Sequence, residues 1–171
     1  EAIRLLEGDD LVTHQPRLGA TVRRLEQAEV VELYEMRAVL EGTAARLAAR
    51  GASMVEIEEL AALNAVMADA KTPTEARDLN RQFHRALKVA ARNRFLIRSM
   101  GAIEKTLLIL GPTTLTDPAR ATEVVQEHAS ILTALANRDG AKAEAVMRGH
   151  IEAALRMRLR DLRLNDPEGE A

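Results

Sequence analysis

Apolar residues recur at three- and four-residue spacings from residue 31 almost to the end of the chain, a pattern that predicts amphipathic helices. Capping residues, glycines and prolines divide this region, because each marks a helix start or end. Gly51 closes the first helix, Ser53 with Glu56 opens the second, and Thr72 with Pro73 opens the third. The six expected helices cover residues 31–50, 53–70, 73–91, 93–110, 118–137 and 139–162.

The first 25 residues follow a different pattern. A helical run ends at Gly8. Two short β-favouring runs follow, at residues 11–14 and 20–22, with a turn-rich segment between them at 15–19. This order is typical of a winged helix, although an ordinary surface hairpin explains the segment equally well. No acidic residue lies between Thr13 and Arg24, so four basic side chains are suited to contact phosphates: His14, Arg17, Arg23 and Arg24.

Composition narrows the fold class. Hydrophobic residues make up 47% of the 171 residues but aromatic residues only 2%, so the core is aliphatic and helix is favoured over sheet. Short connections between helices then predict an all-α fold, an antiparallel bundle of about six helices. No cysteine is present, which excludes disulfides and thiolate metal ligands. No apolar run is long enough for a bilayer, and the net charge of −2 does not itself indicate nucleic acid.

Three of the four histidines lie on the apolar faces of separate predicted helices: His84, His128 and His150. Asn80 precedes His84 by one helical turn, so its amide and the imidazole can converge on one point. A single inward histidine is usually a hydrogen-bonded core residue. Three of them with an oxygen donor favour a metal ion, because one ion satisfies all the buried ring nitrogens together.

Six motifs occur in order over nearly the whole chain. They are LVTHQPRLGATV at 11–22, RAVLEGTAARLAA at 37–49, NRQFHRAL at 80–87, AARN at 90–93, EHASILTAL at 127–135 and RDGAKAEAVMRGHIEAAL at 138–155. Together they resemble the GntR family of bacterial transcription regulators, in the FadR-type subfamily that carries the all-helical FCD ligand-binding domain. The resemblance implies an FCD-like bundle preceded by the remnant of a winged helix-turn-helix domain with a short β-hairpin wing.

The resemblance also implies a division of the chain and its partners. Residues 1–25 are expected to be the C-terminal part of a DNA-binding domain, 26–30 a linker, 31–164 an effector-binding and dimerisation domain, and 165–171 a disordered tail. The implied partners are operator DNA and a second copy of the chain. The implied location is the cytoplasm, and no membrane partner is expected. The residues expected to contact DNA are Arg4, Thr13, His14, Arg17 and Gly19.

In FCD domains that bind a metal, one carboxylate or amide and three histidines hold a divalent ion. The matching positions here are Asn80, His84, His128 and His150. Zinc is the expected metal, with nickel or manganese as alternatives. The first ligand is more commonly Asp in the family, and Asn offers only a neutral oxygen, so we expect weaker metal binding and a greater dependence on an anionic ligand.

A small organic acid is the implied effector, and its binding is expected to change the operator affinity of the dimer. Arg37 matches an arginine that faces the pocket in relatives, where a guanidinium can hold a carboxylate through two hydrogen bonds. A salt bridge to Glu41 on the same helix explains Arg37 equally well from the sequence. Arg120 is a second candidate of the same kind.

Two other functions are compatible with three histidines. A metal-dependent enzyme needs a general base, and the only carboxylate next to a ligand is Glu127, which points about 100° away from its neighbour His128. No nucleophile or phosphate loop accompanies the site. A helical module with a purely structural metal is the other alternative. The wing-like segment favours regulation over both.

Overall fold

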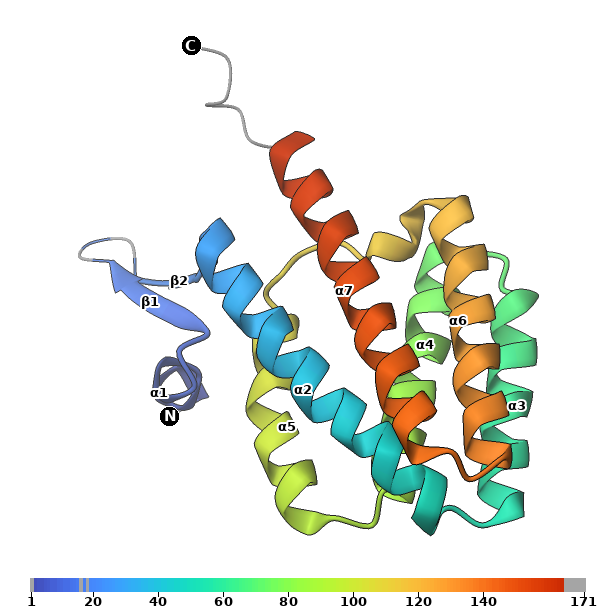
Figure 1. Cartoon of the computed structure of the whole chain (residues 1–171). Helices are drawn as coiled ribbons and strands as arrows, with labels where there is room; N and C mark the ends of the chain where they lie inside the picture. The colour runs from blue at the N-terminus through green and yellow to red at the C-terminus, as the bar shows by residue number, and fades with distance from the viewer. Residues whose placement is uncertain (1, 16, 18, 165–171) are drawn as a thin grey trace.

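The computed structural model describes residues 2–15, 17 and 19–164, which form a helical bundle with a small hairpin beside it (Figure 1). The elements are α1 (Ala2–Gly8), β1 (Val12–Gln15), β2 (Gly19–Val22), α2 (Gln27–Gly51), α3 (Met54–Ala68), α4 (Pro73–Ala90), α5 (Arg94–Leu107), a 3-10 turn η1 (Thr114–Thr116), α6 (Pro118–Ala136) and α7 (Gly140–Leu164). The predicted helical bundle and hairpin are confirmed. The expected tail at 165–171 lies outside the described residues. None of the described helices is long and apolar enough to cross a membrane.

Four helices begin at the capping residues that the sequence indicated. Ser53 and Glu56 form the expected capping box: Ser53 Oγ accepts from the Glu56 N–H at 3.2 Å, and Glu56 Oε2 accepts from the Ser53 N–H at 2.7 Å. Thr72 and Asp117 cap α4 and α6, each followed by proline at the first helical position. Asp139 Oδ1 accepts from the backbone N–H three residues later, at 2.9 Å. Local sequence therefore determines these starts.

Two boundaries differ from the expectation. The helix expected from residue 31 begins at Gln27, because Glu29 Oε2 accepts the Glu26 N–H at 2.9 Å and Val30 of the added turn is buried in the core. The residues expected as a linker thus form the first turn of α2. The helix expected to reach residue 110 ends at Leu107, and the chain then turns through Gly111, whose φ is +82°.

The two longest helices, α2 and α7, lie side by side through the centre of the bundle (Figure 1). The facing surface of α2 is built from fully buried alanines, which let the backbones approach closely: Ala45, Ala48 and Ala49. A Cβ at Gly42 would come within 2.8 Å of Arg148 Cγ of α7. Helices α3, α4 and α6 complete the core, whose largest fully buried apolar side chains are Phe83, Leu60, Leu87, Ile131, Leu135, Met147 and Ile151.

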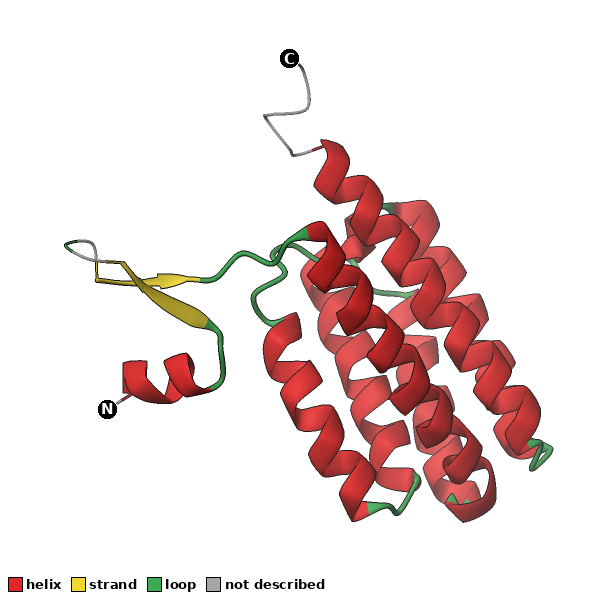
Figure 2. Cartoon of the chain, turned by 60° about the vertical axis from the view of Figure 1, so that its left-hand side comes forward, coloured by secondary structure: helices red, strands yellow, loops and turns green. Residues whose placement is uncertain are grey.

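The hairpin stands away from the bundle, on the side where α2 begins (Figure 2). Its strands pair antiparallel, with Thr13 opposite Thr21, as the winged-helix interpretation expects. Lys105 Nζ of α5 is 2.6 Å from Asp9 Oδ2, which ties the bundle to the turn before β1. Arg23 pairs with carboxylates on both sides, Asp10 before β1 and Glu29 in α2. Arg23, expected near phosphate, is therefore engaged in fixing the hairpin to α2.

The capping box of α3 provides a simple test of the fold. Ser53→Ala removes the side-chain acceptor for an otherwise unpaired N–H, so we expect a loss of about 1 kcal/mol in the free energy of unfolding. Ser130→Ala is the matched control, because Ser130 Oγ only donates back to Gln126 O on the exposed side of α6. Urea unfolding in the presence of a chelator measures both. Equal losses in the two variants would contradict the assigned role of Ser53.

Candidate metal centre

The three inward histidines meet at one point inside the bundle. His84 comes from α4, His128 from α6 and His150 from α7, and their ligand nitrogens lie within 4.8 Å of one another. His84 Nε2 and His150 Nε2 are 3.1 Å apart. Two nitrogens at about 2.0–2.1 Å from one zinc ion lie at most about 4.2 Å apart, so this spacing suits a shared ion. The fold thus brings together the histidines that the sequence singled out.

Helical periodicity explains why these polar rings are buried. His128 follows Val124 by four residues and precedes Ile131 by three, so all three share the inner face of α6. His150 occupies the corresponding face of α7, three residues after Met147. His128 is 0% exposed and His150 3% exposed. The site is therefore shielded from bulk water on the sides that these helices cover.

Two of the three imidazoles are held by carboxylates through Nδ1. The Nδ1 of His150 lies 2.6 Å from Glu127 Oε2, and the Nδ1 of His84 contacts Glu41 Oε2. A carboxylate that accepts Nδ1–H fixes both the tautomer and the ring orientation, and it leaves Nε2 with a free lone pair. This is the arrangement that metal-binding histidines commonly use.

Each carboxylate is held in turn by a buried arginine. Arg37 Nε donates to Glu41 Oε1 at 2.5 Å. The two terminal nitrogens of Arg120 donate to both oxygens of Glu127, each at 2.8 Å, and Arg120 also bonds Glu123. Two hydrogen-bonded chains, each of an arginine, a glutamate and a histidine, therefore meet at the centre of the site. They are Arg37–Glu41–His84 and Arg120–Glu127–His150.

Several buried polar atoms have no partner within the described part of the chain. They include both ring nitrogens of His128 at the centre and the side-chain oxygen of Asn80, which lies one helical turn before His84 on α4. Buried polar groups are almost always hydrogen-bonded, so the unpartnered nitrogens of His128, beside the Nε2 atoms of His84 and His150, require an explanation. A divalent metal ion satisfies a set of nitrogen and neutral oxygen donors of this kind. The residues present therefore fit the metal that the family resemblance implies.

The electrostatics keep His128 and His150 neutral. Burial lowers the pKa of the His150 imidazole to about 4, although its hydrogen bond to Glu127 acts in the opposite direction. Burial, with the nearby His150 and His84 rings, holds the pKa of His128 well below its usual range. A neutral imidazole is the form that binds a metal, so both rings are competent ligands at neutral pH.

The two glutamates are kept ionised. Burial acts to raise the pKa of the Glu41 carboxyl, but Arg37 and His84 outweigh burial and hold this pKa well below its usual range. The pKa of Glu127 is lowered in the same way: burial opposes the shift, and hydrogen bonds from His150 and Arg120 produce it. The site therefore carries matched positive and negative charges before any ion binds.

The structure shows one of the two sequence interpretations of Arg37, the salt bridge. Arg37 forms the salt bridge with Glu41, and through Glu41 it also belongs to the histidine centre. The roles of the two glutamates as histidine partners were missed by sequence reasoning. Glu127 does point away from its neighbour His128, as the helical geometry required, but that direction leads to His150 on α7.

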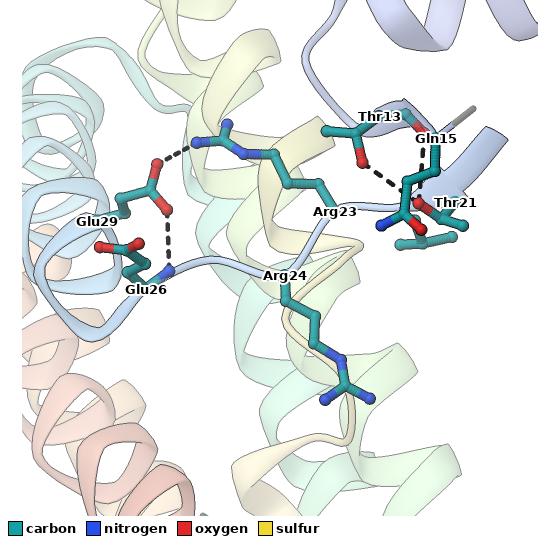
Figure 3. A pocket seen from close by; sticks show the side chains of 8 residues that line it. Thr13, Gln15, Thr21, Arg23, Arg24, Glu26 and Glu29 are labelled. Atoms are coloured by element: carbon teal, nitrogen blue, oxygen red, sulfur yellow. Dashed lines mark hydrogen bonds and ion pairs between the residues drawn. The ribbon is translucent and has the colours of Figure 1, made fainter. Parts of the chain in front are cut away.

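The residues expected to contact DNA are not near this centre. Arg4, Thr13, His14 and Arg17 are exposed on α1 and the hairpin, and Gly19 opens β2 with a positive φ of 82°. A groove of about 690 Å³ lies between the hairpin and the start of α2 (Figure 3). Its lining includes Thr13, Gln15, Thr21 and Arg24, whose guanidinium makes no contact with the other residues drawn. The hairpin and the histidine centre are thus separate regions.

The FCD domain family matches residues 32–153. The chain belongs to this family. Its fold is similar to E. coli McbR/YncC, with a TM-score of 0.81 at 19% identity over 94% of this chain and 82% of that chain. It is also similar to Lar, described as controlling expression of the Listeria monocytogenes agr system, with a TM-score of 0.70 at 17% identity over 93% and 77% of the two chains.

Streptococcus agalactiae GntR has the same fold, with a TM-score of 0.63 at 19% identity over 91% of this chain and 78% of that chain. None of the curated sequences compared with the chain matches it. The predicted FCD bundle is confirmed, and the chain shares the fold of these solved structures.

Proposed function

We propose that this FCD protein is a metal-dependent metabolite sensor, in which the bundle binds one divalent ion and a small organic acid that changes the operator affinity of a dimer. The observation that supports the proposal is the close approach of the Nε2 atoms of His84 and His150, 3.1 Å apart, beside the unpartnered nitrogens of His128. A core with no ligand to bind gains nothing from these groups, because each unpartnered polar atom costs free energy of folding.

The donor set favours zinc. His84, His128 and His150 supply three nitrogens and Asn80 a neutral oxygen, a combination that suits zinc, with nickel and manganese as alternatives. An amide oxygen contributes no charge, so this set attracts a hard cation less strongly than one with an aspartate. Metal affinity should therefore depend more strongly on whether an anionic ligand is bound at the same site.

Charge balance favours an anionic effector. Arg37 is matched by Glu41, and Arg120 by Glu127 and the largely exposed Glu123, so a divalent ion leaves the site with an excess of positive charge. A carboxylate that completes the coordination of the ion neutralises part of this charge. Because Arg37 is already bonded to Glu41, an effector recruits this guanidinium only by sharing it with that carboxylate, and the same holds for Arg120.

The residues proposed to contact DNA lie on α1 and the hairpin. Arg4, Thr13, His14, Arg17 and Gly19 are proposed to contact the operator, with the hairpin as the wing near the backbone or minor groove. A two-fold operator needs two copies of the chain, and such a regulator acts in the cytoplasm. An effector that binds one arrangement of the dimer more tightly than another shifts the population toward that arrangement. Operator affinity then changes by the difference between the two effector-binding free energies, typically about 1–3 kcal/mol.

Metal analysis and thermal unfolding of the purified chain test this function. We expect about one zinc per chain, and removing it with a chelator should lower Tm. At a free zinc concentration of 100 times Kd, the stabilisation is about 2.7 kcal/mol, or roughly 5–10 °C in Tm for a domain of this size. His14→Ala, on the hairpin, is the control and should retain the metal.

A panel of small carboxylates added to the zinc-loaded and the chelated protein then tests the effector class. A carboxylate that raises Tm only when zinc is present supports the sensor. Equal shifts with and without zinc would show that the acid binds without the metal, and zinc binding with no response to any acid would favour a structural metal. Protein without zinc affinity would overturn the proposed metal site.

A further inference from the structure

The three imidazoles of the centre are not held in the same way. The Nδ1 atoms of His84 and His150 are each bonded to a carboxylate. His128 has no hydrogen-bond partner among the described residues at either ring nitrogen. A metal-binding histidine almost always has its other nitrogen held by a carboxylate, a carbonyl or water. Something other than a protein hydrogen bond must therefore orient this ring.

The ring of His128 is stacked on Phe83. The two ring centroids are 3.8 Å apart and the planes are within 7° of parallel, and both side chains are fully buried. Phe83 is next to His84 on α4, and successive residues of a helix point about 100° apart. Helix α4 therefore presents one histidine to the centre and, from the neighbouring position, the phenyl ring that packs against a second histidine.

We propose that Phe83 is a positioning residue for metal binding, because its ring sets the plane of the His128 imidazole. This inference rests on the proposed metal site. Both nitrogens of an imidazole have their lone pair or N–H in the ring plane, so a fixed plane fixes the direction in which a ligand nitrogen points. The stack thereby does for His128 what the hydrogen bonds to Glu41 and Glu127 do for the other two rings.

The stack should also favour the metal-bound state. Two neutral aromatic rings gain less from nearly face-to-face stacking than from offset or edge-to-face packing, because their negative faces repel. An imidazole that donates its lone pair to a cation loses electron density, and a phenyl face attracts a positively polarised group. Phe83 therefore stabilises the bound state more than the free state. From the usual strength of aromatic pairs, the effect on affinity is about three- to tenfold.

The test compares zinc dissociation constants of Phe83→Leu and a matched core variant. We expect Phe83→Leu, which keeps an apolar side chain but loses the ring, to raise the Kd for zinc about three- to tenfold and to shift the visible absorption bands of the cobalt-loaded protein. Leu87→Ala is the control, since Leu87 is 1% exposed one turn further along α4 and carries no aromatic ring. It should lower Tm without changing Kd or the cobalt spectrum.

Three results separate the possible failures. An unchanged Kd in Phe83→Leu, with zinc bound by the unaltered chain, would overturn the role of Phe83 alone, and so would an equal loss in Leu87→Ala. No zinc binding by the unaltered chain would overturn the metal site as well. If Phe83→Leu does not fold, NMR of the unaltered chain decides the matter: the His128 ring protons should show the upfield ring-current shift of a stacked phenyl, and its absence overturns the proposal.

Discussion

Replacement of His128 by leucine should abolish tight zinc binding and at the same time make the metal-free protein more stable. The imidazole is fully buried with two unpartnered nitrogens, which cost about 1–3 kcal/mol relative to an apolar group of similar shape. Leucine removes this cost and loses a ring stack worth about 0.5–1.5 kcal/mol. We expect a net gain of about 1 kcal/mol in the free energy of unfolding of the chelated protein.

The loss of zinc affinity should exceed the 10- to 100-fold that typically follows when a residue supporting a ligand is removed, because the ligand itself is gone. Urea unfolding in a chelator and a competition titration with zinc measure the two effects, and His14→Leu on the exposed hairpin is the control. A destabilised metal-free variant would mean that the His128 nitrogens have partners in the free protein. Opposite signs for stability and affinity are typical of a residue retained for binding.

Local sequence signals predicted most of the fold. Ser53, Thr72 and Asp117 cap helices where expected, because a cap satisfies N–H groups of the following turn and depends on few residues. The start of α2 was placed four residues late, although Val30 in this first turn is fully buried. The turn is capped by Glu29 bonding to the Glu26 N–H, and glutamate before a helix is a weaker start signal than the serine, threonine or aspartate of the other caps.

The candidate site was predictable only in part for a related reason. The inward direction of His84, His128 and His150 follows from each helix alone. Which groups they meet depends on how the helices pack: Glu41 reaches His84 across 43 residues of sequence, and Glu127 reaches His150 across 23. Such contacts have no local signature, because the same glutamates read as ordinary helical charges. The ligands were therefore found and their supporting carboxylates were not.

Glu127 provides the sharpest test of that support. Glu127→Gln keeps the shape and an oxygen able to accept the His150 Nδ1–H, but it removes the negative charge that makes the imidazole a stronger donor to a metal. We expect zinc affinity to fall about 10- to 100-fold, as is usual when the partner of a ligand histidine is changed. The measurement is a competition titration with zinc, together with urea unfolding in a chelator.

Glu123→Gln is the matched control for this variant. Glu123 also bonds Arg120, at 3.0 Å, but it is 62% exposed and contacts none of the three histidines. Both variants remove a carboxylate partner of Arg120, so they share any effect of leaving that buried guanidinium less well paired. Only Glu127→Gln changes a histidine partner, so only it should weaken zinc binding. Equal zinc affinities in the two variants would show that Arg120 and Glu127 stabilise the bundle without tuning the metal ligand.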